Sequence, residues 1–146
     1  MKPLASLTEV LEYENDEVVR RFSRENRISL DDAQDIFLET KRWLWLCASS
    51  PGRAVNMVGE AFVIDAMWHV FLLFTHDYAE FCSRYFPEFV HHVPKPEIEP
   101  NQARDARWRE DLRKDYEYIY DRLGADTLLK WCQNYPEKFA ALRAEG

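Results

Sequence analysis

Apolar residues recur at helical spacing in five separate segments of this chain, and no two segments form a convincing pair of strands. Two of the segments open with a capping-box pattern, in which Ser6 precedes Glu9 and Ser29 precedes Asp32 by three residues. The sequence therefore predicts an all-α fold. We expect a single compact bundle of about six helices over residues 1–146, with a proline-rich extended loop at 91–100.

Caps and breakers along the chain set the expected helix boundaries. Pro51 and Gly52 end the second helix, and Pro87 falls just beyond the fourth. Thr75 is the expected N-cap of the fourth helix, and Gly124 is the expected C-terminal cap of the fifth. We expect helices at about residues 7–25, 30–50, 58–74, 76–86, 101–123 and 125–132, followed by a tail that begins at Pro136.

Composition narrows the class of protein. The 146 residues are 47 % hydrophobic and 14 % aromatic, which is enough to bury a core and too apolar for a disordered chain. A net charge of −7 disfavours nucleic acids and anionic membranes as partners, because both require a basic surface. The longest apolar run, at 61–74, is shorter than the ~20 residues of a membrane helix, and acidic residues stand where a signal peptide would be apolar. These features predict a cytoplasmic protein whose three cysteines are reduced and buried.

The apolar run AFVIDAMWHVFLLF, residues 61–74, carries two polar side chains, Asp65 and His69. Residues four apart on a helix face each other one turn apart, so this carboxylate can accept a hydrogen bond from the imidazole. Such a pair is typical of a metal-bound histidine held by its carboxylate partner. It is equally typical of a buried polar pair at a helix crossing, whose loss would be strongly destabilising. For Asp65 and His69 alone, both interpretations stand.

All four histidines lie in one short stretch that begins at His69 and ends with the adjacent pair His91 and His92. Neighbouring side chains of an extended segment point to opposite faces, so one of that pair is expected to turn inward. We expect it to return beside His69 and to form one buried polar site with Asp65. Zinc or iron would accept such ligands, although none of the familiar metal-binding spacings is present. His76, at the start of the fourth helix, is expected to be an exposed residue.

The stretch reads D-x-x-W-H from Asp65 to His69, then an apolar run, then H-H-x-P from His91 to Pro94. This pattern resembles the core of the glycine-rich domain-containing protein-like family, and its signature core would span residues 61–96. The matching residues are Asp65, Trp68, His69, Thr75, Tyr78, Phe81, Cys82, His91, His92 and Pro94. The resemblance implies a helical domain with an Asp/His signature and no established reaction.

Two departures from the family pattern bear on function. Many relatives look like W-H-x-H, and Phe71 stands here at the position of the second histidine, which removes a ligand from the expected set. The glycine-rich tail of the plant members is also absent, so their regulatory or RNA-related roles are not expected here. Trp68, Thr75 and Tyr78 are expected to support the polar site.

Two classes of function fit these observations. The first is an interaction or regulatory module, in which Asp65, His69 and one of His91 and His92 lock helix to loop while a surface patch binds a protein partner. The second is a divalent-metal-binding protein or a metal-dependent enzyme that uses the same residues as ligands. Cys82 lies on an apolar helix face and is expected to be an inert thiol, so nucleophilic catalysis has little support. Whether the protein is an enzyme stays open at this level.

Overall fold

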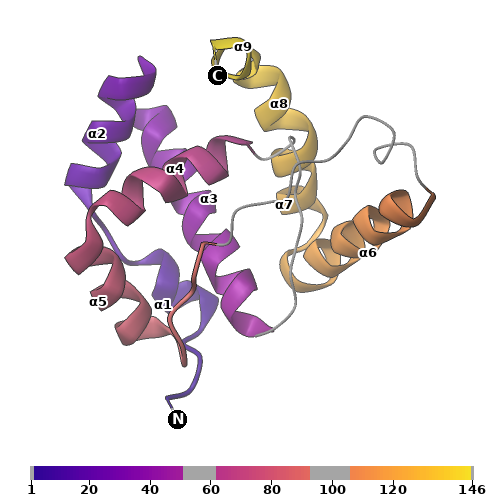
Figure 1. Cartoon of the computed structure of the whole chain (residues 1–146), viewed down its shortest axis with the longest axis horizontal. Coiled ribbons are helices and arrows are strands. Elements are labelled where there is room, and N and C mark those ends of the chain that lie inside the picture. The colour runs from indigo at the N-terminus through magenta and orange to yellow at the C-terminus, as the bar shows by residue number, and fades with distance from the viewer. Residues whose placement is uncertain (1, 51–61, 93–105, 146) are drawn as a thin grey trace.

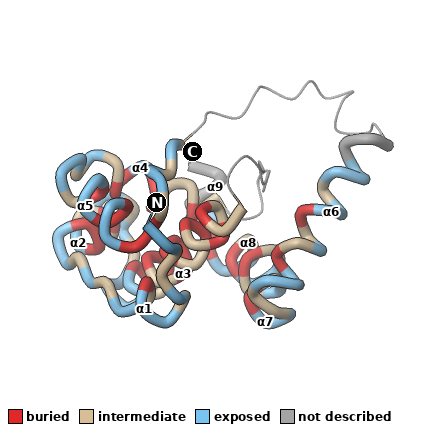
Figure 2. Tube along the Cα trace, turned by 90° about the horizontal axis from the view of Figure 1, so that it is seen from below, coloured by how far each residue is buried: buried red, intermediate tan, exposed pale blue. Residues whose placement is uncertain are grey.

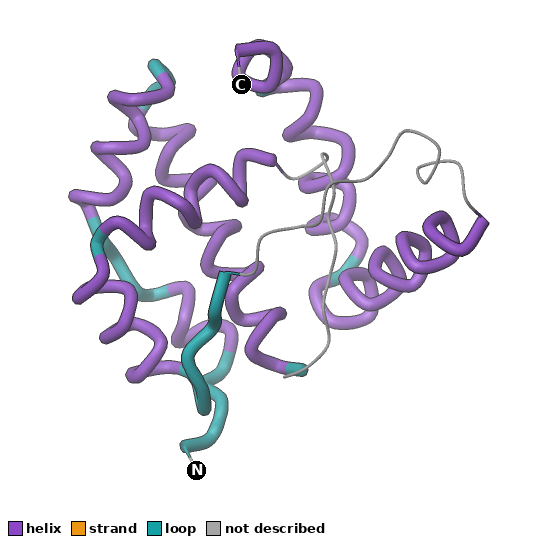
Figure 3. Tube along the Cα trace, in the orientation of Figure 1, coloured by secondary structure: helices purple, strands orange, loops and turns teal. Residues whose placement is uncertain are grey.

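The computed structural model describes residues 2–50, 62–92 and 106–145. These residues form helices and connections without any strand, and 80 % of them are helical (Figure 3), which confirms the all-α prediction. No helix in the described ranges is long and apolar enough to span a bilayer. The elements are α1 (Leu7–Leu11), α2 (Asp16–Asn26), α3 (Leu30–Ser49), α4 (Phe62–Leu73), α5 (Thr75–Tyr85), α6 (Ala106–Leu123), α7 (Ala125–Leu129), a π-helical turn (Lys130–Asn134), α8 (Tyr135–Lys138) and α9 (Ala140–Glu145). The proline-rich part of the expected loop, like Pro51 and Gly52, lies outside the described residues.

Helix α3 is the element around which the N-terminal half is organised. It packs against α1, α2 and α4, and buried positions concentrate where these helices meet (Figures 1 and 2). Phe37 of α3 meets Phe71 of α4 with ring centroids 5.4 Å apart, and Phe81 of α5 lies at the same distance from Phe71. Each of these three rings is at most 1 % exposed. The aromatic residues thus form a core, as their helical spacing predicts.

The single helix expected at residues 7–25 is wrong, because the structure divides it into α1 and α2. Asn15 takes an extended conformation and its side chain accepts from the backbone N–H of Val18, so it caps a new helix start. The ammonium of Lys41 donates to the carbonyls of Leu11 and Tyr13, at 2.8 and 2.5 Å. These two bonds satisfy carbonyls at the break that would otherwise be orphaned at the end of α1.

Two other expected boundaries differ from the structure. Thr75 is the first residue of α5 rather than its cap; the N-cap is Phe74, which makes no side-chain capping hydrogen bond. Pro136 lies inside α8 instead of beginning a tail. In the π-helical turn before it, the backbone N–H of Tyr135 donates to the carbonyl of Lys130, five residues earlier. This wider turn replaces the four-residue hydrogen-bond spacing of an α-helix, which a proline would interrupt. Gly124 does separate α6 from α7, at φ 92°, as its position predicts.

A polar network fastens the C-terminal helices to α3. The carboxylate of Glu39 accepts from the indole N–H of Trp131 at 2.8 Å and from the ammonium of Lys130 at 3.1 Å. Asp35, one turn earlier, accepts from Lys130 at 2.7 Å and from the Tyr135 hydroxyl at 2.6 Å. Glu39 is 2 % exposed and Trp131 is fully buried. The sequence patterns indicate none of these contacts, which join residues more than 90 positions apart.

Candidate functional site

Helix α4 presents Asp65 and His69 on the face opposite its packed side. Its buried residues include Ile64, Met67 and Phe71, which point toward the core. Asp65 and His69 lie one turn apart, with 3.3 Å between Oδ2 of the carboxylate and Nδ1 of the imidazole. Their side chains are 42 % and 56 % exposed. The expectation that this polar site is buried is therefore wrong, because only one side of the apolar run packs against other helices.

The third member comes from the extended segment that follows α5. The Nε2 atom of His92 lies 2.8 Å from Oδ1 of Asp65, and the His92 side chain is 15 % exposed. Its ring centroid lies 4.4 Å from that of His69 and 4.4 Å from that of Trp68. One carboxylate thus faces two imidazoles, one through each oxygen.

His91 does not join this cluster. Its side chain is exposed, and its ring lies 4.7 Å from that of Phe89. Adjacent residues of an extended segment point to opposite sides, so placing His92 beside Asp65 turns His91 away. His76 and Thr75 are exposed residues at the start of α5. Of the expected site residues, the structure therefore brings together Asp65, His69 and His92.

Position 71 faces away from the cluster. Phe71 is fully buried and packs its ring edge against Tyr78, at 5.0 Å between centroids. Two residues along a helix correspond to a rotation of about 200°, so position 71 lies almost opposite to His69. A histidine at that position would enter the aromatic core, and Phe71 therefore removes no ligand from this site.

Trp68 and Tyr78 form a hydrogen-bonded chain behind the cluster. The indole N–H of Trp68 donates to the hydroxyl oxygen of Tyr78 at 3.1 Å, and this hydroxyl donates to the carbonyl of Val90 at 2.5 Å. Burial raises the pKa of Tyr78 far above its ordinary value, so the hydroxyl keeps its proton. Burial also raises the pKa of the neighbouring Cys82 thiol, which fits an unreactive group. The segment before His92 is thus anchored to both α4 and α5.

The three side chains form a donor set that suits a divalent transition metal. One ligand atom from each of Asp65, His69 and His92 lies within 4.8 Å of the others. Ligand atoms bound to one tetrahedral zinc ion stand roughly 3.3–3.6 Å apart. The separations of such a ligand set in this site are below 4.8 Å, and each imidazole already lies close to one oxygen of the carboxylate, at 2.8 Å for His92 and 3.3 Å for His69. Two imidazoles and one carboxylate can therefore close on an ion with small side-chain movements.

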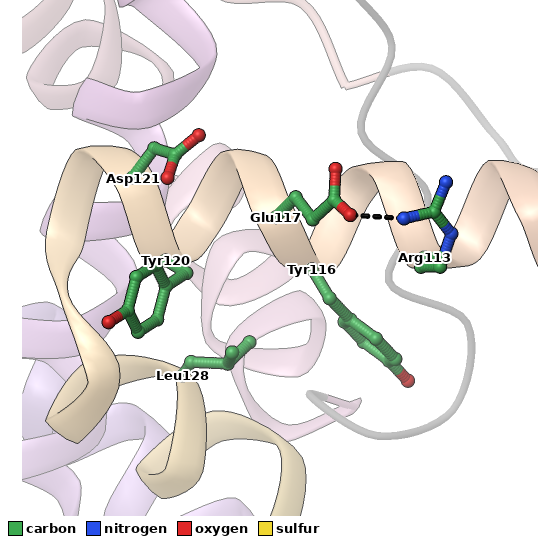
Figure 4. Close-up of a pocket in the computed structure, with 6 residues that line it drawn as sticks. All are labelled: Arg113, Tyr116, Glu117, Tyr120, Asp121 and Leu128. Carbon is green, nitrogen blue, oxygen red and sulfur yellow. Dashed lines mark hydrogen bonds and ion pairs between the residues drawn. The ribbon is translucent and has the colours of Figure 1, made fainter.

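A separate pocket lies elsewhere, between α6 and α7 (Figure 4), with a volume of about 410 Å³. The pocket is lined by Arg113, Tyr116, Glu117, Tyr120, Asp121 and Leu128. The guanidinium of Arg113 is paired with Glu117 and Glu110. None of the lining residues belongs to α4 or to the segment that carries His92, so this pocket is distinct from the Asp65 cluster.

Comparison with known proteins corrects the resemblance proposed from the sequence. A family model described as UCP032817-like matches residues 7–125, which is most of the chain and includes Asp65, His69 and His92. Searches of curated proteins and of solved structures found no match. The assignment to the glycine-rich domain-containing protein-like family is therefore wrong: the short Asp/His pattern is too small a part of the chain to define a family. On the evidence of this match, the chain belongs to the UCP032817-like family.

Proposed function

We propose that this protein binds a divalent transition metal, zinc or iron, through Asp65, His69 and His92. The observation that carries the proposal is the convergence of three ligand atoms, from two separate segments, within 4.8 Å. The donor set is one that both zinc and iron(II) accept in proteins. Helix α4 supplies two ligands with fixed spacing, and the extended segment supplies the third.

Exposure of the cluster favours a metal site over a purely structural contact. The side chains of Asp65 and His69 are about half exposed, so water and an ion can reach the ligand atoms. Even an exposed contact between opposite charges contributes only about 0.2–1 kcal/mol to stability. The contact between Asp65 and His69 would therefore add little to a hydrogen-bonded staple. Removing His69 should likewise cost under about 1 kcal/mol, in contrast to the strong destabilisation that a buried pair would produce. Removing Asp65 should cost more, because Asp65 also contacts His92, which is only 15 % exposed.

Three protein ligands leave part of the coordination sphere open. Structural zinc sites usually have four protein ligands, whereas catalytic sites keep a position for water or substrate. A bound ion would supply Lewis acidity and would lower the pKa of a water molecule at that position. Asp65, His69 and His92 would hold the ion and orient each other, and they would leave the solvent side open. We propose no particular reaction, and we place the protein in the cytoplasm.

Metal binding is tested with protein purified without a histidine tag and stripped with a chelator. Zinc affinity is measured by competition with a chromophoric chelator, and iron(II) affinity under anaerobic conditions. We expect one ion per chain in the wild type. His69→Ala and His92→Ala should each weaken binding by at least about 10-fold, because each removes a ligand. His91→Ala is the matched control, since His91 neighbours His92 and points away.

The measurement also separates the two function classes. If the wild type binds neither ion, or if His91→Ala and His92→Ala weaken binding equally, the metal proposal is refuted. A metal-free protein that keeps full stability in a chelator would then favour the interaction module with a protein partner. Melting curves for each variant show whether lost binding reflects lost folding.

A further inference from the structure

His92 is the one ligand of the proposed site that no helix holds in place. It lies in the extended segment after α5, which belongs to no helix or strand among the described residues. Asp65 and His69, by contrast, are set by a single turn of α4. The relative placement of the two ligand segments therefore depends on what fastens residues 86–92 to the helices.

Tyr78 supplies a large part of that fastening, beside the Cys82 thiol, which is hydrogen-bonded to the backbone of Val90. Its hydroxyl donates to the carbonyl of Val90, two residues before His92. Its ring meets Phe89 of the same segment nearly at right angles, with centroids 5.3 Å apart. One side chain of α5 thus holds the segment through both its ring and its hydroxyl group.

Tyr78 is itself held rigidly. It is 1 % exposed, and its ring packs edge-on against Phe71 in the aromatic core. Its hydroxyl oxygen accepts a hydrogen bond from the indole N–H of Trp68, and the same hydroxyl group donates a hydrogen bond to the carbonyl of Val90. A buried hydroxyl that both donates and accepts has one preferred orientation, so it can define the position of the carbonyl that it binds.

Trp68 closes the circuit, because it lies on α4 between Asp65 and His69. Its ring edge lies against the ring of His92, with centroids 4.4 Å apart. The connection therefore runs from α4 through Tyr78 of α5 to the extended segment, and returns to α4 where His92 meets Asp65.

We propose that Tyr78 is a positioning residue, which fixes His92 beside Asp65 and thereby sets the metal affinity of the site. The second part rests on the proposed function; the first part does not. Partners that orient metal ligands typically change metal affinity by about 10–100-fold when they are removed. Tyr78 binds the backbone carbonyl of Val90, so it determines the position of the backbone from which the His92 side chain extends.

The test is Tyr78→Phe, which keeps the ring and removes the hydroxyl group. Tyr135→Phe is the matched control, because it removes another tyrosine hydroxyl, bonded to Asp35 in the network on α3. Both variants should melt below the wild type, since each loses a hydrogen bond that holds two elements together. Zinc affinity should fall by about 10–100-fold in Tyr78→Phe and should stay unchanged in Tyr135→Phe.

A second readout uses the metal-free protein. Nuclear Overhauser contacts between the Trp68 and His92 rings should be strong in the wild type and in Tyr135→Phe, and weak or absent in Tyr78→Phe. If the wild type binds no metal, the metal site is refuted. Loss of the contacts between the Trp68 and His92 rings in Tyr78→Phe would still support the positioning role in that case. Retention of both the contacts and the zinc affinity in Tyr78→Phe would overturn the positioning role.

Discussion

Replacement of Glu39 by glutamine tests whether the polar network holds the C-terminal helices onto α3. Glu39→Gln keeps the shape of the side chain and replaces one acceptor oxygen by an amide N–H₂ group. Trp131, Lys130 and Arg42 all direct donors at this carboxylate, at 2.8, 3.1 and 3.2 Å. At least one of these donors would then face another donor in a site that is 2 % exposed.

The magnitude follows from these contacts. Hydrogen bonds to charged groups contribute about 1.5–3 kcal/mol each, and an unsatisfied buried group costs about 1–3 kcal/mol. Lys130 is 31 % exposed and keeps its contact with Asp35, so its share of the loss is small. We therefore expect Glu39→Gln to lower the free energy of unfolding by about 2–3 kcal/mol. For a domain near this size, that change lowers Tm by roughly 5–10 °C.

Urea and thermal unfolding, followed by circular dichroism and tryptophan fluorescence, measure the loss. Glu25→Gln is the matched control, because Glu25 pairs with Arg21 on the exposed side of α2. This variant should melt like the wild type. A double-mutant cycle with Trp131→Phe should show a coupling of about 0.5–3 kcal/mol, since the two side chains share a hydrogen bond. A Tm for Glu39→Gln within about 1 °C of the wild type, or additive effects in the cycle, would refute the reasoning.

Three further predictions follow from other buried groups. Burial lowers the pKa of Lys41 to about 8, so between about pH 8 and 10.5 the unfolded chain binds a proton that the folded chain lacks. Lys41 therefore adds a positive slope, of at most about 1.4 kcal/mol per pH unit, to the free energy of unfolding in that window, whereas the raised pKa values of Cys47 and Cys82 add negative slopes. The slope measured by urea unfolding should thus be more positive in the wild type than in Lys41→Met, and parallel curves would contradict this. Burial raises the pKa of Cys47 to about 12 and also raises that of Cys82. A thiol reagent should therefore label both cysteines slowly before urea is added. Fast labelling of Cys82 in the native protein would contradict this prediction. Phe71→His should destabilise the fold by about 2–4 kcal/mol without strengthening zinc binding, because position 71 faces the core. Tighter zinc binding in this variant would show that the side chain at position 71 reaches the metal site.

Local patterns were sufficient for the helical character of the fold. The side chains of Ser6 and Ser29 accept from the backbone N–H groups of Glu9 and Asp32, as the capping pattern predicts. Capping depends on a few neighbouring residues, so the sequence alone contains it. The break before Asn15 was missed, because the residues of α1 and α2 continue one helical period and the compensating cation, Lys41, comes from a distant part of the chain.

The C-terminal contacts depended on tertiary structure entirely. Pro136 looked like the start of a tail by the local rule for proline, and a π-helical turn accommodates it within the helical segment. The contacts of Glu39 and Asp35 with Lys130 and Tyr135 then fasten that segment to α3. No periodicity in the sequence reports a hydrogen bond between residues so far apart.

The candidate site also has one part that the local sequence determined and one part that tertiary packing determined. The sequence by itself determined that Asp65 and His69 face each other, since a four-residue spacing on a helix sets their distance wherever the helix lies. Only the tertiary structure decided that His92, and not His91, completes the cluster, because the orientation of an extended segment depends on the contacts made by Tyr78 and Trp68. Tertiary packing also decided that Asp65 and His69 are about half exposed, whereas His92 is largely buried. An apolar run can be read as buried on every side, but a helix is covered only where neighbouring elements pack against it.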